Sequence, residues 1–61
     1  MTKYFDLHYI NTSFGRNVKT VRHLAATNFD DAMTEAYFAI KYTKGHSYEL
    51  YRNGKFFIDF I

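Results

Sequence analysis

The chain has 61 residues, of which 48% are hydrophobic, and it carries 7 Phe, 6 Tyr and a formal net charge of +2. With so short a chain and no cysteine to form disulfides, we expect one compact domain over residues 1–61 that depends on aromatic packing. No apolar run approaches the roughly 18 residues of a membrane span and no charged-then-apolar leader begins the chain, so we expect a soluble, cytoplasmic protein.

The first third of the chain has the pattern of a β-hairpin. Residues 3–10 alternate apolar with polar side chains, which is typical of a strand, although Tyr4 and Ile10 interrupt the polar side. Residues 11–17 collect turn-forming side chains, including Gly15, and we expect a hairpin loop there. Residues 18–26 begin with β-branched side chains, but the alternation fails near His23. We therefore predict a second strand with a bulge or an early end at His23.

A helix is predicted next. Asn28 can act as an N-cap, and Asp30 and Asp31 place negative charge in the first turn, where the helix dipole favours it. We expect the helix to run to about Lys44, with Gly45 as the C′ residue. At about 100° per residue, one face forms the predicted core stripe: Phe29, Ala32, Met33, Ala36, Tyr37, Ile40 and Thr43.

The strongest local pattern is Asn53-Gly54 between the apolar-aromatic runs 47–52 and 55–61, which is typical of a type I′ hairpin. The predicted register pairs Arg52 with Lys55, Tyr51 with Phe56, Leu50 with Phe57, Glu49 with Ile58 and Tyr48 with Asp59. The predicted fold is α+β, in the order ββαββ, with an antiparallel sheet of two hairpins and one helix packed on one face.

This register makes both faces of the second hairpin apolar, whereas one helix covers only one of them. We assign Tyr51, Phe56, Ile58 and Phe60 to the core, which leaves the opposite face without a partner. The first predicted partner-binding site lies on that opposite face: Tyr48, Leu50, Phe57, Arg52 and Lys55. Scattered surface apolar residues or a symmetric homodimer are the alternatives.

A second predicted site lies on the outer side of the helix. Phe38 projects away from the core stripe, and Tyr42 follows it one turn later. The pair either stabilises the helix itself or forms part of an interface.

The sequence contains no catalytic, metal-binding or phosphate-binding motif. His8, His23 and His46 fall in separate predicted elements with no cysteine to complete a metal site, and all three glycines fall in predicted turns or caps. We therefore expect neither a metal nor another cofactor, and no enzymatic activity. Nucleic-acid binding is the alternative function, with a pI near 9.0 and a basic rim around Tyr48 and Phe57. The rim residues are Arg16, Lys19, Arg22, Arg52 and Lys55.

Residues 25–36, Ala-Ala-Thr-Asn-Phe-Asp-Asp-Ala-Met-Thr-Glu-Ala, resemble the strand-to-helix passage of small early proteins of tailed bacteriophages, over about a fifth of the chain. The resemblance implies a compact virus-encoded inhibitor that binds a host or defence protein in the bacterial cytoplasm and blocks it sterically. Nucleases, CRISPR effectors, toxins and RNA polymerase are targets of such proteins. The resemblance assigns no functional residue.

Overall fold

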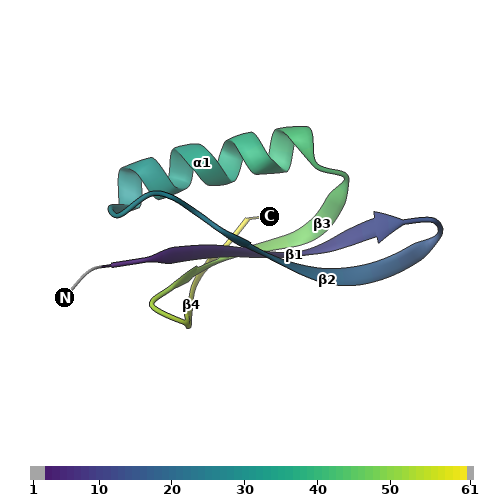
Figure 1. Cartoon of the computed structure of the whole chain (residues 1–61), viewed down its shortest axis with the longest axis horizontal. Coiled ribbons are helices and arrows are strands. Elements are labelled where there is room, and N and C mark those ends of the chain that lie inside the picture. Colours follow the sequence, from purple (N-terminus) through teal and green to yellow (C-terminus); the bar gives the residue numbers. More distant parts are fainter. Residues whose placement is uncertain (1–2, 61) are drawn as a thin grey trace.

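The computed structural model describes residues 3–60, which form one four-stranded antiparallel sheet with a single helix lying across one face (Figure 1). In chain order the elements are β1 (Phe5–Ser13), β2 (Arg16–His23), α1 (Phe29–Tyr42), β3 (Gly45–Arg52) and β4 (Lys55–Asp59). The strand order across the sheet is β2-β1-β3-β4, so the two hairpins meet at β1 and β3. The predicted α+β class is confirmed. Ile61, the last residue of the predicted final strand, lies outside the described residues.

The first hairpin is tighter than the sequence predicts. Phe14 (φ 51°) and Gly15 (φ 75°) form a two-residue turn, so both strands extend into the region 11–17 that we expected to be a loop. β2 ends at His23, as predicted, and does not continue to residue 26. The strand ends there because the N–H groups of Ala25 and Ala26 donate hydrogen bonds to the Glu35 carboxylate, at 3.3 and 2.8 Å, in place of a strand partner.

The start of α1 is also confirmed, since the Asp31 N–H donates to the Asn28 side-chain oxygen at 2.9 Å. Its end differs from the prediction. The helix stops at Tyr42 with Thr43 as the C-cap, and Gly45 opens β3 instead of serving as the C′ residue. Gly45 meets a different requirement, because a Cβ at this position would lie 2.7 Å from the carbonyl oxygen of Ile10. The glycine therefore lets β3 approach β1 closely.

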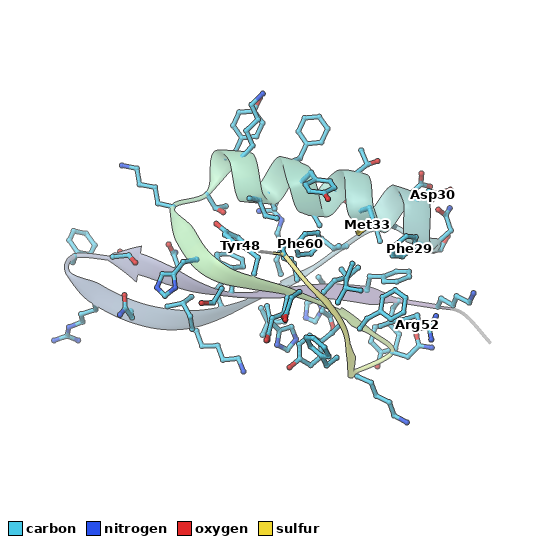
Figure 2. All side chains as sticks on the ribbon, turned by 180° about the vertical axis from the view of Figure 1, so that it is seen from behind. Phe29, Asp30, Met33, Tyr48, Arg52 and Phe60 are labelled. Atoms are coloured by element: carbon cyan, nitrogen blue, oxygen red, sulfur yellow. The ribbon has the colours of Figure 1, made fainter. Side chains whose placement is uncertain are left out.

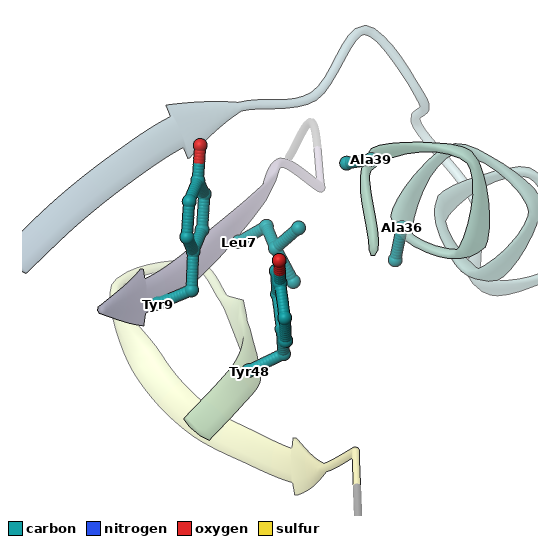
Figure 3. Close-up of a cluster of buried hydrophobic side chains, with 5 residues drawn as sticks. All are labelled: Leu7, Tyr9, Ala36, Ala39 and Tyr48. Atoms are coloured by element: carbon teal, nitrogen blue, oxygen red, sulfur yellow. The ribbon is translucent and has the colours of Figure 1, made fainter. Parts of the chain in front are cut away.

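The core lies between α1 and the sheet. The helix contributes small buried side chains, Ala32, Ala36 and Ala39, and these let it lie close to the strands. The sheet contributes the large ones: Phe5, Leu7, Tyr9, Tyr48 and Leu50. Figure 3 shows the part of this core in which Tyr9 and Tyr48 stand on the sheet beside Leu7 and face Ala36 and Ala39.

The predicted core stripe of α1 is partly wrong. Ala39, which the periodicity left out, is buried. Phe29 and Tyr37, which it included, lie beside the buried face of α1 and remain exposed. Their rings make edge contacts with Phe57 and Phe60, with 5.5 Å between centroids in each pair.

A β-bulge in the second hairpin overturns the predicted faces. Tyr51 pairs with Phe56 as predicted, but Leu50 pairs with Ile58, so Phe57 is an extra residue on β4. The bulge moves Ile58 and Phe60 to the same face as Leu50, and all three pack against the core beneath α1.

The same bulge leaves Tyr51 and Phe56 on the face away from the helix. Their assignment to the core is therefore wrong, while that of Ile58 and Phe60 is confirmed. In Figure 2, Tyr48 and Phe60 lie between the helix and the sheet.

Candidate functional site

Two residues of the first predicted site are part of the core. Leu50 is 0% exposed and Tyr48 is 7% exposed, so neither presents a surface to a partner. The Tyr48 ring stacks on Tyr9 with 4.9 Å between centroids, and its hydroxyl lies 2.7 Å from the Thr43 hydroxyl oxygen. The prediction that these side chains are exposed is wrong, because α1 covers the face of β3 that carries Tyr48 and Leu50, and the bulge brings Ile58 and Phe60 to that same face.

The rest of that site lies at the tip of the second hairpin. Phe57 is half-buried, with the Phe29 ring against its edge and the Arg52 guanidinium 4.5 Å from its centroid. Arg52 and Lys55 are exposed. The tip therefore offers cationic side chains, but its aromatic ring is already covered by residues of this chain.

The second predicted site lies on the outer side of α1, as expected, and the structure shows that both of its aromatic side chains are exposed. Phe38 is 58% exposed and Tyr42 is 72% exposed, and their rings stack with 6.1 Å between centroids and an interplanar angle of 12°. The Lys41 ammonium lies 5.6 Å from the centroid of the Tyr42 ring. Tyr37 adds a third exposed aromatic side chain. We refer to Tyr37, Phe38, Lys41 and Tyr42 as the α1 ridge.

A groove runs along one flank of the ridge, between α1 and β2, with a volume of about 340 Å³. No local sequence pattern predicts this groove, because it forms where α1, β2 and the segment that connects them meet. We call it the α1–β2 groove, and its lining includes Arg22, Leu24, Glu35, Phe38, Tyr42 and Thr43. Phe38 and Tyr42 therefore belong both to the ridge and to one wall of the groove.

The predicted basic rim does not form a single cluster. Arg16, Lys19 and Arg22 lie on β2, at one edge of the sheet, whereas Arg52 ends β3 and Lys55 begins β4, at the tip of the second hairpin, with β1 between the two groups. The β2 residues also alternate, so that Arg16 and Arg22 project on the helix side and Lys19 on the opposite side. Arg52 lies over the Phe57 ring, but the five cations do not form the predicted rim around Tyr48 and Phe57.

The face of the sheet away from α1, which we call the open face, has an aromatic centre that the sequence analysis missed. His8 stacks on Tyr51 with 3.7 Å between centroids and an interplanar angle of 9°, and Tyr51 meets the edge of Phe56. Sequence reasoning missed it because Tyr51 and Phe56 were assigned to the core. Three carboxylates, those of Asp6, Glu49 and Asp59, share this face by strand register.

The electrostatics of the open face are mixed. Within residues 3–60, Nδ1 of His8 is buried without a hydrogen-bond partner. Burial and then the positive charge of Lys19 lower the pKa of His8, while the carboxylates of Asp6 and Glu49 oppose the shift. Asp6 also contacts Nδ1 of His23, with 2.5 Å between the nitrogen and the carboxylate oxygen.

No family model, curated protein or solved structure matches this chain. In the part of the chain that the structure describes, no helix has both the length and the apolar character to cross a membrane. Residues 3–60 likewise contain no group of three or more His, Asp or Glu side chains positioned to hold a metal ion.

Proposed function

We propose that this chain is a non-enzymatic protein-binding module whose contact surface is the α1 ridge. The observation that carries the proposal is the exposure of Phe38 and Tyr42 on a helix whose opposite side is packed on the sheet. Aromatic side chains of this kind are enriched at the centres of protein interfaces. Since each ring is more than half exposed, burial against a partner contributes about 1–2 kcal/mol for each.

The geometry of the ridge also lowers the entropic cost of binding. The two rings stack on each other and stand on a capped helix that is fixed to the sheet by three buried alanines. Side chains already held in one arrangement lose less freedom when a partner covers them. Lys41 beside Tyr42 adds a positive charge, so a carboxylate next to an apolar contact on the partner suits this surface.

The class of partner follows from the resemblance of residues 25–36 to small early proteins of tailed bacteriophages. On that basis the partner is a bacterial host or defence protein, such as a nuclease, a CRISPR effector, a toxin or RNA polymerase. A folded domain of 61 residues inhibits such a protein by occupying a surface that the protein needs. This role requires no catalytic group.

Nucleic-acid binding has less support from the geometry. The aromatic rings of the open face share it with Asp6, Glu49 and Asp59, and these charges repel a phosphate backbone. The cationic side chains of the predicted rim are divided between β2 and the tip of the second hairpin. A dedicated nucleic-acid surface instead concentrates them around the stacking residues.

The test is affinity capture from a bacterial lysate on the immobilised protein, followed by identification of the retained proteins by mass spectrometry. The double variant Phe38→Ala/Tyr42→Ala removes the ridge aromatics. A matched control, Tyr4→Ala/Phe56→Ala, removes two aromatic side chains that are also about half exposed but lie elsewhere. We expect the specific partner to be lost with the first variant and kept with the second. An unchanged set of retained proteins with the ridge variant, at unchanged circular dichroism, refutes the proposal.

A further inference from the structure

The sheet has one long, regular edge. β2 is the outermost strand on its side and has 8 residues, and its register with β1 is unbroken from Asp6↔His23 to Ser13↔Arg16. The opposite edge strand, β4, has 5 residues and carries the bulge at Phe57. Short and bulged edges resist pairing with another strand, whereas a long regular edge accepts one. β2 is therefore the edge that is open to strand addition.

The backbone groups that face outward on β2 follow from its pairing. The Leu24 N–H donates to the carbonyl oxygen of Phe5 at 3.0 Å, which makes this a hydrogen-bonded pair. Hydrogen-bonded and non-bonded pairs alternate along an antiparallel ladder, so every second residue of β2 directs its N–H and C=O away from β1. These residues are Asn17, Lys19, Val21 and His23. At one N–H and one C=O each, four residues offer eight backbone groups to an added strand.

The α1–β2 groove lies beside this edge on the helix side. A strand that pairs with β2 directs every second side chain towards the helix side of the sheet. There it meets Leu24, Phe38 and Tyr42, which supply the apolar part of the groove. The remaining side chains project on the open face, next to Lys19. Backbone pairing for affinity, with pockets for alternate side chains, is how protein domains bind extended segments at a sheet edge.

The charge of β2 indicates what kind of strand fits. β2 contains Arg16, Lys19 and Arg22 and no carboxylate. Within residues 3–60 none of these three forms an ion pair. A paired strand lies about 4.8 Å away, well inside the Debye length of about 8 Å at physiological ionic strength. Of the three cations, Lys19 is the one on the open face, and the carboxylates of that face lie farther from this edge, on β1, β3 and β4. Acidic side chains that an added strand projects on the open face beside Lys19 are therefore attracted, and a second copy of β2, with the same three cations, is repelled.

We propose that the β2 edge and the α1–β2 groove bind an extended acidic segment of the partner by antiparallel strand addition. In the bound segment, apolar side chains that enter the groove alternate with Asp or Glu on the open face. This inference rests on the proposed function, because Phe38 and Tyr42 belong to both surfaces. It adds the chemistry of the segment that the partner presents.

The probe is a blocked, fluorescently labelled peptide of alternating Glu and Val, about nine residues long to span β2. Binding is followed by fluorescence anisotropy. In the proposed pairing the Glu residues oppose Lys19 and Val21, so it is their N–H groups that donate to β2. N-methylation of the Glu residues must therefore abolish binding, while N-methylation of the Val residues leaves it intact. A peptide with Lys in place of Glu must bind at least tenfold more weakly.

The matched protein variants are Val21→Pro and Val21→Thr. The Val21 N–H points away from β1, so proline at this position removes an outward donor without breaking the β1–β2 ladder. We expect Val21→Pro to weaken peptide binding by about tenfold or more, the equivalent of about 1.4 kcal/mol. Val21→Thr keeps the N–H and the branched side chain, and it should bind as the wild type does.

The following results would contradict the inference. Absence of binding, equal binding of the Lys peptide, or indifference to N-methylation rejects strand addition by an acidic segment. A concentration-dependent dimer in sedimentation that Val21→Pro abolishes assigns the edge to a second copy. Strong, salt-sensitive binding of an oligothymidine in place of the peptide assigns it to nucleic acid.

The lysate experiment separates this inference from the proposed function. If the captured protein is lost with Phe38→Ala/Tyr42→Ala but kept with Val21→Pro, the strand-addition inference fails and the proposed function stands. If neither variant changes what is captured, the proposed function fails.

Discussion

Replacement of Leu50 by alanine tests which face of β3 belongs to the core. Leu50 is completely buried in a cluster with Phe5 and Ala32. Substitutions of buried leucine by alanine cost about 3–5 kcal/mol, because transfer free energy is lost and a cavity remains. A domain of 61 residues has a total stability of roughly 3–9 kcal/mol at about 0.05–0.15 kcal/mol per residue. Leu50→Ala therefore removes a large part of the free energy of unfolding.

The matched substitution is Phe56→Ala, on the open face. Phe56 is 52% exposed and its ring makes an edge contact with Tyr51, so we expect a loss of about 1 kcal/mol. The assay is urea unfolding followed by circular dichroism. With a slope of about 1 kcal/mol per molar urea, Leu50→Ala should lower the midpoint by about 3 M or leave the chain unfolded, and Phe56→Ala by about 1 M. If Leu50→Ala costs no more than Phe56→Ala, Leu50 faces solvent and the bulge at Phe57 is refuted.

Three further predictions concern single contacts. Gly45→Ala should lower the unfolding free energy by about 1–3 kcal/mol, because the new Cβ lies 2.7 Å from the Ile10 carbonyl oxygen and the backbone must move; Gly15→Ala, with open space around it, should cost only the roughly 1–2 kcal/mol of its positive φ. The lowered pKa of His8 means that the unfolded chain binds the His8 proton more readily than the folded chain does. The free energy of unfolding is therefore unaffected by His8 above the ordinary pKa of 6.5 and falls as the pH drops from there towards the folded-state pKa. The urea midpoint of His8→Gln should fall less than that of the wild type over this pH range, and an equal fall contradicts the assignment. Glu35→Ala should cost about 1–2 kcal/mol and accelerate amide exchange at the segment before α1, because two N–H groups lose their acceptor; unchanged exchange there would show that the carboxylate does not hold this segment.

The features that sequence reasoning predicted correctly depend on a few neighbouring residues. Asn53 (φ 51°) and Gly54 (φ 80°) form the predicted turn, because few residues tolerate positive φ at two adjacent positions. Asn28 caps α1 because its side chain reaches an N–H only three residues ahead. The position of Phe38 and Tyr42 on the outer side of α1 follows from helical periodicity alone. Each of these is a local property of the chain.

What only the tertiary structure decided is which surface each strand residue occupies and which surfaces lie next to each other. Three consecutive apolar residues, Phe56, Phe57 and Ile58, are compatible with a regular hairpin or with a bulge, and side-chain alternation cannot distinguish the two. Packing of α1 on the sheet decides it, because the bulge lets Ile58 join Leu50 in one core. The free edge of β2 and the groove beside Phe38 follow from strand order and helix position, which arise from contacts between residues far apart in the chain.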